Sequence, residues 1–135
     1  MAKRPALTAA LLATPDDCEA QFYEALQQAD LERLMALWAD EDDIACIHPG
    51  GLRLMGAPLI RASFAEIFAH GAIDCRPDEV RKVLLGQVAV HTLTEIVRVQ
   101  TAEGSQLGHV LASNVYLHTP LGWRMVLDRK STRLN

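Results

Sequence analysis

Hydrophobic residues recur at helical spacing in the first half of the chain. After a helix-start pattern at residues 14–17, a threonine and a proline followed by two aspartates, apolar side chains recur every three or four positions up to Ala29. Asp30 interrupts this stripe and caps a second, shorter one that runs from Leu31 to Trp38. The pattern predicts two amphipathic helices that meet at the Ala29–Asp30 corner as a hairpin-like pair.

An acidic turn and a short strand follow the second helix. Four acidic residues at 40–43 lead into an apolar run at residues 44–48, which the corner Pro49-Gly50-Gly51 ends. The acids lack the glycine and the ligand spacing of an EF-hand, so we interpret them as a solvated turn. A second short strand is predicted at residues 52–55, and Pro58 opens a third helix.

The hydrophobic period changes to that of strands in the second half of the chain. The predicted strands cover residues 79–85, 88–100, 108–119 and 123–127. Turn-forming residues, above all glycine, separate them. Helices first and then a long antiparallel meander, with one helix inserted after the first short strands, predict an α+β fold in which a curved sheet wraps over helices on one face.

The composition is that of one ordinary globular domain. The chain has 135 residues, of which 50% are hydrophobic and 22% charged. A formal net charge of −4 and scattered basic residues argue against nucleic acid as a partner, and no apolar run approaches the ~20 residues of a membrane span. The three cysteines are widely spaced without a CxxC motif, which indicates free thiols and predicts a cytoplasmic protein.

Both ends of the chain differ from the stretch between them. Residues 1–13 carry a short apolar run that Pro5 interrupts, and we interpret them as a leader segment packed near the first helix rather than as a secretion signal. The basic, patternless residues 128–135 match the translation of a common sequencing-adapter read. We expect this tail to be an artefact after a domain at residues 14–127, the alternative being a short natural tail. Without its three cations and one acid, the formal net charge would be −6.

Several segments between residues 16 and 127 carry a resemblance to a known family. They are residues 22–30, 37–51, Gly56, 114–116 and 122–126. In order and spacing they resemble the SnoaL-like proteins of the nuclear transport factor 2-like, or ketosteroid isomerase-like, superfamily. The resemblance implies a cone-shaped fold, in which a curved antiparallel or mixed sheet wraps around three helices and encloses a ligand-binding pocket. It also implies a homodimer, the usual assembly of the family. Its members include ketosteroid isomerase, scytalone dehydratase, polyketide cyclases, limonene epoxide hydrolase and non-catalytic modules, so the fold does not fix the function.

The resemblance also implies positions for a site. Ketosteroid isomerase-like members have an aspartate base just before a proline, after the first strand, and His48 before Pro49 occupies the matching place. A first-helix tyrosine donates to the oxyanion in those enzymes; Phe22 stands at the matching position, and Tyr23 is expected to point elsewhere on the helix. A protonated aspartate on a later strand is the second donor, and Asn114 matches it. This sequence departs from the family's residue types at all three places.

His48 and Asn114 are therefore the candidate catalytic residues. An imidazole acts as acid or base near neutral pH, and an amide donates a hydrogen bond to a carbonyl or oxyanion without any tuning of its protonation. Phe22 and Trp38 are expected to form an apolar wall of the pocket. Tyr116 and His118 alternate with Asn114 along one strand, so they are expected to lie on the same face of the sheet. The predicted pocket residues are Phe22, Trp38, Tyr116 and His118.

Other interpretations stay open for these polar residues. If both residues are purely structural, His48 only forms a hydrogen bond with a backbone carbonyl at its corner, and Asn114 only forms a hydrogen bond with a neighbouring strand. Cys46 shares a face with His48, and such a thiol–imidazole pair is a candidate nucleophile or half of a metal site. No third ligand stands at regular spacing, and neither a metal nor a cofactor is predicted. The other histidines interpreted as surface or cap residues are His70, His91 and His109.

Three functions are compatible with these patterns. The first is a domain that binds a small apolar or carbonyl ligand and catalyses proton transfer, dehydration or cyclisation on a small carbonyl compound. The second is a non-catalytic dimeric interaction or accessory module whose exposed sheet face is the functional surface. The third is a stress or accessory protein with a vestigial pocket. The sequence holds no nucleotide loop, metal cluster or nucleophile motif that would name a substrate.

Overall fold

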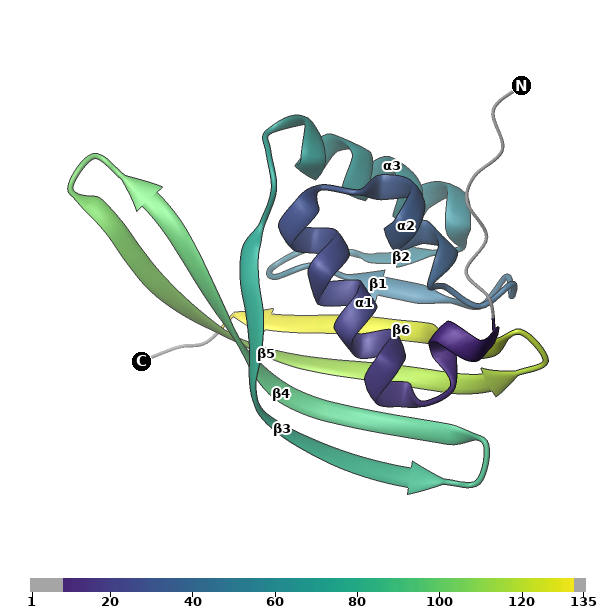
Figure 1. Cartoon of the computed structure of the whole chain (residues 1–135). Helices are drawn as coiled ribbons and strands as arrows, with labels where there is room; N and C mark the ends of the chain where they lie inside the picture. Colours follow the sequence, from purple (N-terminus) through teal and green to yellow (C-terminus); the bar gives the residue numbers. More distant parts are fainter. Residues whose placement is uncertain (1–8, 133–135) are drawn as a thin grey trace.

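Three α-helices, one 3₁₀ helix and six strands make up residues 9–132, the part of the chain that the computed structural model describes. The elements in chain order (Figure 1) are η1 (Ala9–Leu12), α1 (Pro15–Gln28), α2 (Leu31–Ala36), β1 (Ala45–Ile47), β2 (Arg53–Met55), α3 (Ala57–Ala69), β3 (Asp74–Leu85), β4 (Val88–Thr101), β5 (Gly104–Thr119) and β6 (Gly122–Thr132). The predicted order of helices and strands is confirmed. The ends of the predicted leader and tail, residues 1–8 and 133–135, lie outside the described residues.

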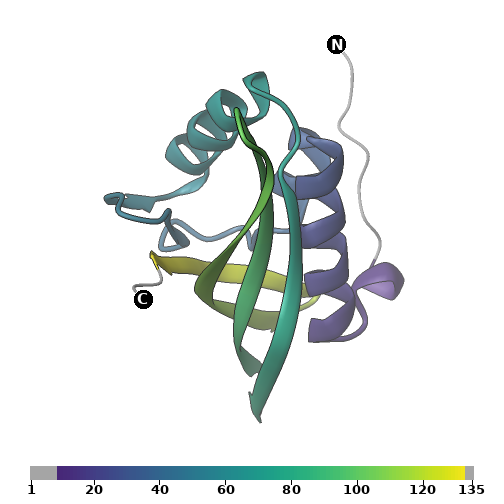
Figure 2. The same ribbon diagram turned by 90° about the vertical axis from the view of Figure 1, so that its left-hand side faces the viewer.

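The six strands form one mixed sheet in the order β2-β1-β6-β5-β4-β3. Neighbouring strands are antiparallel except β1 and β6, which are parallel. The sheet curves around α1, and α3 lies beyond one end of α1 in both views (Figures 1 and 2). The predicted cone, a curved sheet around three helices, is confirmed.

Local signals fix both ends of α1. Thr14 Oγ1 accepts the Asp17 N–H at 3.1 Å, while Asp17 Oδ2 accepts the Thr14 N–H at 3.1 Å, a reciprocal capping box. The helix ends where Ala29 takes a left-handed conformation with φ 51°. Asp30 then caps α2 by accepting the Arg33 N–H at 3.1 Å. The predicted corner between the two helices is therefore built from one left-handed residue and one cap.

The core lies between α1, α3 and the concave face of the sheet. Its large side chains from the helices include Phe22 and Phe64, and those from the sheet include Tyr116 and Met125. Leu12 of η1 is also fully buried, and η1 contacts α1 and β6. Burial of such apolar side chains stabilises each by about 1.5–3 kcal/mol relative to exposure.

The segment after α2 runs along β6 before it reaches β1. The Ala39 N–H donates to the Met125 carbonyl at 2.8 Å, and the Met125 N–H donates to the Leu37 carbonyl at 2.8 Å. These two bonds hold Trp38 in place, with its side chain in the core at 5% exposure. The acidic residues 40–43 follow as an exposed turn, as the sequence pattern predicts.

Two long strands begin earlier than predicted. β3 begins at Asp74 rather than at residue 79, with Pro77 paired to Glu95 and an irregularity before Arg81. A proline is tolerated there because β3 is an edge strand. β5 begins at Gly104 rather than at residue 108, since only two residues separate it from β4.

The predicted tail does not interrupt β6. The backbone of residues 128–132 continues the strand, with Asp128 paired to Asn114 and Lys130 paired to Ala112 of β5. Backbone pairing does not depend on the side chains involved. The adapter origin of residues 128–135 therefore stays a prediction.

Candidate functional site

His48 lies directly after β1, where the chain turns. The Gly51 N–H donates to the His48 carbonyl at 2.9 Å, and Gly50 takes a φ of 67°, which glycine adopts without strain. The half-buried imidazole has its Nε2 2.6 Å from Ser63 Oγ of α3 and packs edge-on against the Phe64 ring. Burial, and then the charge of Lys130, lower the pKa of His48. The imidazole is thus neutral at neutral pH and has a side-chain partner rather than a backbone carbonyl.

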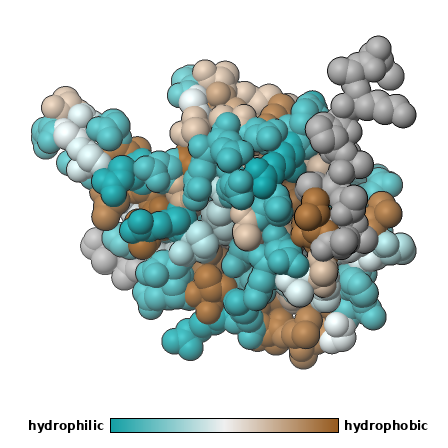
Figure 3. Space-filling model, in the orientation of Figure 1, coloured by the Kyte–Doolittle hydropathy of each residue, from teal (hydrophilic) through white to brown (hydrophobic). Residues whose placement is uncertain are grey.

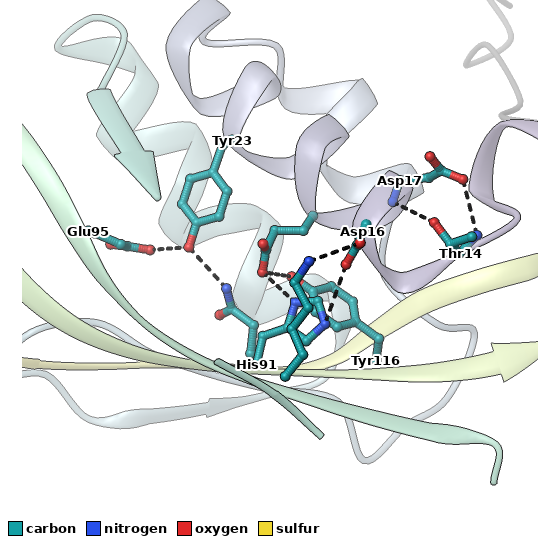
Figure 4. A network of polar contacts seen from close by, with 10 residues as sticks. Thr14, Asp16, Asp17, Tyr23, His91, Glu95 and Tyr116 are labelled. Atoms are coloured by element: carbon teal, nitrogen blue, oxygen red, sulfur yellow. Dashed lines mark hydrogen bonds and ion pairs between the residues drawn. The ribbon is translucent and has the colours of Figure 1, made fainter. Parts of the chain in front are cut away.

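Asn114 lies at the floor of the interior with an exposure of 0%. Its Nδ2 donates to the Tyr23 hydroxyl at 3.0 Å, and that hydroxyl donates to Glu95 Oε2 at 2.7 Å (Figure 4). Turned over, the same amide accepts from Tyr23 at 3.0 Å and donates to Asp128 Oδ1 at 2.8 Å. Either orientation keeps the contact with Tyr23. The expectation that Tyr23 points elsewhere was therefore wrong, because this hydroxyl reaches the residue that the resemblance selected.

A buried lysine joins the carboxylates next to Asn114. Lys130 Nζ lies 2.6 Å from Glu95 Oε2 and 2.7 Å from Asp128 Oδ1. Burial raises the pKa of Asp128 against the opposing charge of Lys130. Burial also works against the charge of Lys130, but the two carboxylates outweigh it and raise the pKa of this ammonium. Asp128 and Lys130 belong to the predicted tail.

Interior contacts connect the two candidate catalytic residues. Cys46 Sγ lies 3.7 Å from His48 Nε2 and 3.9 Å from Asp128 Oδ2, and Asp128 is the neighbour that the turned amide of Asn114 contacts. His48 and Asn114 therefore lie at opposite ends of one row of polar side chains. Burial, and then the charge of Asp128, raise the pKa of the Cys46 thiol. A protonated thiol is a poor nucleophile and a poor metal ligand, which disfavours that alternative.

A second buried cluster lies beneath the first half of α1. His91 Nδ1 is 2.7 Å from Glu19 Oε2, which also accepts the Tyr116 hydroxyl at 3.2 Å (Figure 4). Asp16 Oδ1 lies 3.8 Å from His91 Nε2. Burial, and then the charge of Glu19, raise the pKa of Tyr116. The interpretation of His91 as a surface or cap residue was wrong: it is 1% exposed, because it alternates with other inward positions of β4.

The other predicted pocket residues lie in three different places. Phe22 is a core residue with an exposure of 0%, its ring edge-on to Tyr23. His118 is exposed near the turn between β5 and β6, stacked on Trp123, with its Nδ1 2.7 Å from Gln87 Oε1. Tyr116 belongs to the cluster of Glu19 and His91. The fold thus brings Phe22 near Asn114 through Tyr23 and places His118 at the end of the sheet.

A cavity of about 870 Å³ opens between the helices and the turn that joins β5 to β6. It is bordered by α2, the segment after it, the start of α3 and Arg124 of β6. Of the six predicted site residues, Trp38 alone borders this cavity. Its indole Nε1–H, buried from solvent, has no hydrogen-bond partner within residues 9–132. In that same range no three histidine, cysteine or acidic side chains group as metal ligands.

Sequence reasoning overlooked four polar residues of these clusters. They are Glu19, Ser63, Glu95 and, as a site residue, Tyr23. Glu19 stands four residues before Tyr23, so both fall on the buried face of α1, and Glu95 alternates with inward residues of β4. That spacing was the available signal. Ser63 carries no signal of its own, because only the packing of α3 against the corner brings it to His48.

Comparison with known proteins agrees with this architecture. The family profile of the SnoaL-like domain matches residues 16–132. The chain belongs to the SnoaL-like family. No curated protein matches this SnoaL-like domain. Within residues 9–132, no helix is long and apolar enough to cross a membrane.

Solved structures place this SnoaL-like domain in the nuclear transport factor 2-like superfamily. A provisionally assigned calcium/calmodulin-dependent protein kinase type II association domain from Thiobacillus denitrificans is 30% identical, with 91% of this chain and 98% of that chain covered and a TM-score of 0.82. A provisionally assigned dehydratase of the nuclear transport factor 2-like family from Streptomyces avermitilis is 28% identical, with 90% and 100% covered and a TM-score of 0.78. A calcium/calmodulin-dependent protein kinase II hub from S. rosetta, 15% identical with 96% and 99% covered and a TM-score of 0.71, shares the fold.

Proposed function

We propose that this SnoaL-like domain binds a small apolar or carbonyl compound on the concave side of its sheet and catalyses proton transfer, dehydration or cyclisation on it. His48 is the proposed acid or base, since its neutral imidazole is half-buried and lies at the less buried end of the polar row. Asn114 is the proposed hydrogen-bond donor to the carbonyl oxygen, and Tyr23 fixes its amide. The similarity to the Streptomyces avermitilis protein supports dehydration among these reactions.

The observation that carries this proposal is the buried, hydrogen-bonded group of Tyr23, Glu95 and Asn114. Tyr23 and Glu95 are each 2% exposed and Asn114 is fully buried, yet all three are hydrogen-bonded. Polar groups cost free energy when a core encloses them, and apolar packing of the same volume would avoid that cost. An interior built in this way supports recognition of a polar group on a ligand.

Diacetone alcohol, a small β-hydroxy ketone, is a direct probe of this function. We expect it to raise the melting temperature of the wild type, and we expect slow formation of its enone, followed by ultraviolet absorbance. His48→Ala should lower the rate of enone formation by about 100-fold or more. Leu121→Ala is the matched control, because Leu121 is exposed and borders the separate cavity. The proposal would be contradicted if Leu121→Ala, but not His48→Ala, lost the rise in melting temperature and the formation of enone. It would also be contradicted if diacetone alcohol produced neither in the wild type.

A second candidate function is a non-catalytic dimeric module that associates through the outer face of the sheet. We define the outer face, the side of the sheet away from α1, by five residues: Val83, Leu85, Val90, Val115 and Leu127. Val83, Val90, Val115 and Leu127 are successive cross-strand neighbours, and Leu85 lies two residues after Val83 on the same strand. Val83 is 51% and Leu85 67% exposed. Seen from the helix side, the surface is mostly hydrophilic, and hydrophobic side chains gather over the end of β3 (Figure 3).

A homodimer formed through the outer face is supported by this apolar surface and by the 30% identity to an association domain. Light scattering during size exclusion should give twice the chain mass for the wild type and a smaller mass for Leu85→Lys. Leu52→Lys, at an exposed leucine in the turn between β1 and β2, should keep the dimer. A strict monomer at high concentration would exclude this function. The three buried free cysteines support the cytoplasm as the proposed location.

A further inference from the structure

The Nε2 atom of His48 is already occupied by a hydroxyl of α3. Ser63 Oγ lies 2.6 Å from it, a distance typical of a strong hydrogen bond, and Cys46 Sγ lies 3.7 Å from the same nitrogen. The Phe64 ring, 5.1 Å from the imidazole centroid at 74°, limits rotation of the ring on one side. The imidazole is therefore held with Nε2 toward α3, and Nδ1 is the ring nitrogen that does not contact Ser63.

The direction of the hydrogen bond follows from the partners of Ser63. Within residues 9–132 its hydroxyl makes no hydrogen bond except the one to His48, so the imidazole nitrogen is the acceptor available to its proton. The other neighbour, the Cys46 thiol, keeps its one proton because burial raises its pKa, and directs that proton to Asp128 Oδ2 at 3.9 Å rather than to the imidazole. A nitrogen that receives the Ser63 hydroxyl proton is an acceptor. In a neutral imidazole, the other nitrogen then carries the hydrogen.

We propose that Ser63 holds His48 in the tautomer with its proton on Nδ1. Toward a ligand, Nδ1–H is then a hydrogen-bond donor, and the basic nitrogen is reached only through the Ser63 hydroxyl. This second consequence rests on the proposed function; the tautomer itself does not. Neither Ser63 nor the choice of nitrogen follows from the spacing of residues in the sequence.

The arrangement defines how a proton would leave the ligand. The carbon next to the carbonyl gives its proton to Ser63 Oγ, while the Ser63 hydroxyl gives its own proton to His48 Nε2. The ligand becomes an enolate, the serine is unchanged and His48 becomes an imidazolium. Return of a proton by the reverse path restores the neutral imidazole, so no further reactant is needed.

Nitrogen-15 NMR of protein labelled at histidine tests the tautomer without any ligand. Above the pKa of His48, we expect the chemical shifts and the couplings to ring protons that mark a protonated Nδ1 and an unprotonated Nε2. A protonated Nε2 in the wild type would overturn the proposal outright. Because this measurement uses the wild type, it does not depend on how any variant folds.

Two substitutions then identify which neighbour sets the tautomer. Ser63→Ala should shift the tautomer ratio toward protonated Nε2 by roughly fivefold, the equivalent of one ordinary hydrogen bond, and Ser63→Thr should restore it. Cys46→Ala removes the longer contact and should leave the ratio unchanged. An unchanged ratio in Ser63→Ala would overturn the role of the serine. Failure of diacetone alcohol to react, with the expected tautomer present, would contradict the proposed function alone.

Discussion

At the scale of single residues, Glu19 holds together the polar contacts beneath α1. Its carboxylate is the partner of both the His91 imidazole and the Tyr116 hydroxyl. We predict that Glu19→Ala lowers the free energy of unfolding by about 2–4 kcal/mol, because it leaves two buried polar groups without a partner. Glu24→Ala on the same helix, where the side chain is half exposed in an ion pair with Arg33, should change it by no more than about 0.5 kcal/mol. Urea unfolding of both variants measures the difference; equal effects would contradict the role of Glu19.

Cys18 makes stability depend on alkaline pH. Burial raises the pKa of its thiol from 9.0 to about 12. Above pH 9 the unfolded chain loses this proton while the folded chain keeps it, so the folded state becomes less stable as pH rises toward 12. We predict that Cys18→Ala reduces the slope of unfolding free energy against pH by up to about 1.4 kcal/mol per pH unit in this range. The slope is compared rather than the stability at one pH, so the volume lost in the variant does not affect the result.

The sequence predicts a site residue where a local signal surrounds it. His48 became a candidate because a proline and two glycines end its strand, and Asn114 because a family resemblance marks its strand position. His91 was assigned to the surface because its side chain is polar, although it alternates with the inward residues Ala89 and Leu93. Its partner Glu19 comes from a helix 72 residues away in the chain. Spacing indicates the face on which such a polar residue lies, but not the distant partner that forms its hydrogen bond.

At the scale of elements, the end of α1 contains a correctable strain. Ala29 adopts φ 51°, a left-handed conformation that favours glycine at helix C-termini. We predict that Ala29→Gly stabilises the protein by about 0.5–1 kcal/mol. Ala20→Gly, at an exposed position inside the same helix, should destabilise it by about 1 kcal/mol. Thermal unfolding of the two variants should therefore shift in opposite directions, and a loss of stability in both would contradict the assignment of strain to Ala29.

The strands show where element prediction from sequence stops. Alternation located most of β4 and the later parts of β3 and β5, but residues 74–78 and 104–107 lay outside the predicted strands. Both segments are paired in the sheet. Pro77 is compatible with a strand because β3 lies at the edge, and an edge position is a property of the complete sheet, not of the local sequence. The arrangement of elements was predictable from their periods, whereas their ends depended on neighbours.

At the scale of the whole molecule, the origin of the last strand residues affects the interior. We propose that residues 128–135 are adapter-derived, although Asp128 is fully buried and Lys130 bridges two carboxylates. The family match continues to residue 132, and residues 128–132 are paired with β5. Re-sequencing of the source DNA should give a different reading frame or sequence after Leu127. An intact gene that encodes the same eight residues would contradict this origin.

The outer face links the stability of the molecule to its association. If two copies bury Val83 and Leu85 against each other, unfolding requires dissociation, and mass action raises the melting temperature with protein concentration. We predict such a rise for the wild type and a concentration-independent melting temperature for Leu85→Lys, in which a buried lysine would oppose association. Leu52→Lys should behave like the wild type, because Leu52 lies outside the sheet. Differential scanning calorimetry over a hundredfold range of concentration tests this prediction. A melting temperature that stays constant for all three proteins would show that folding does not depend on the outer face.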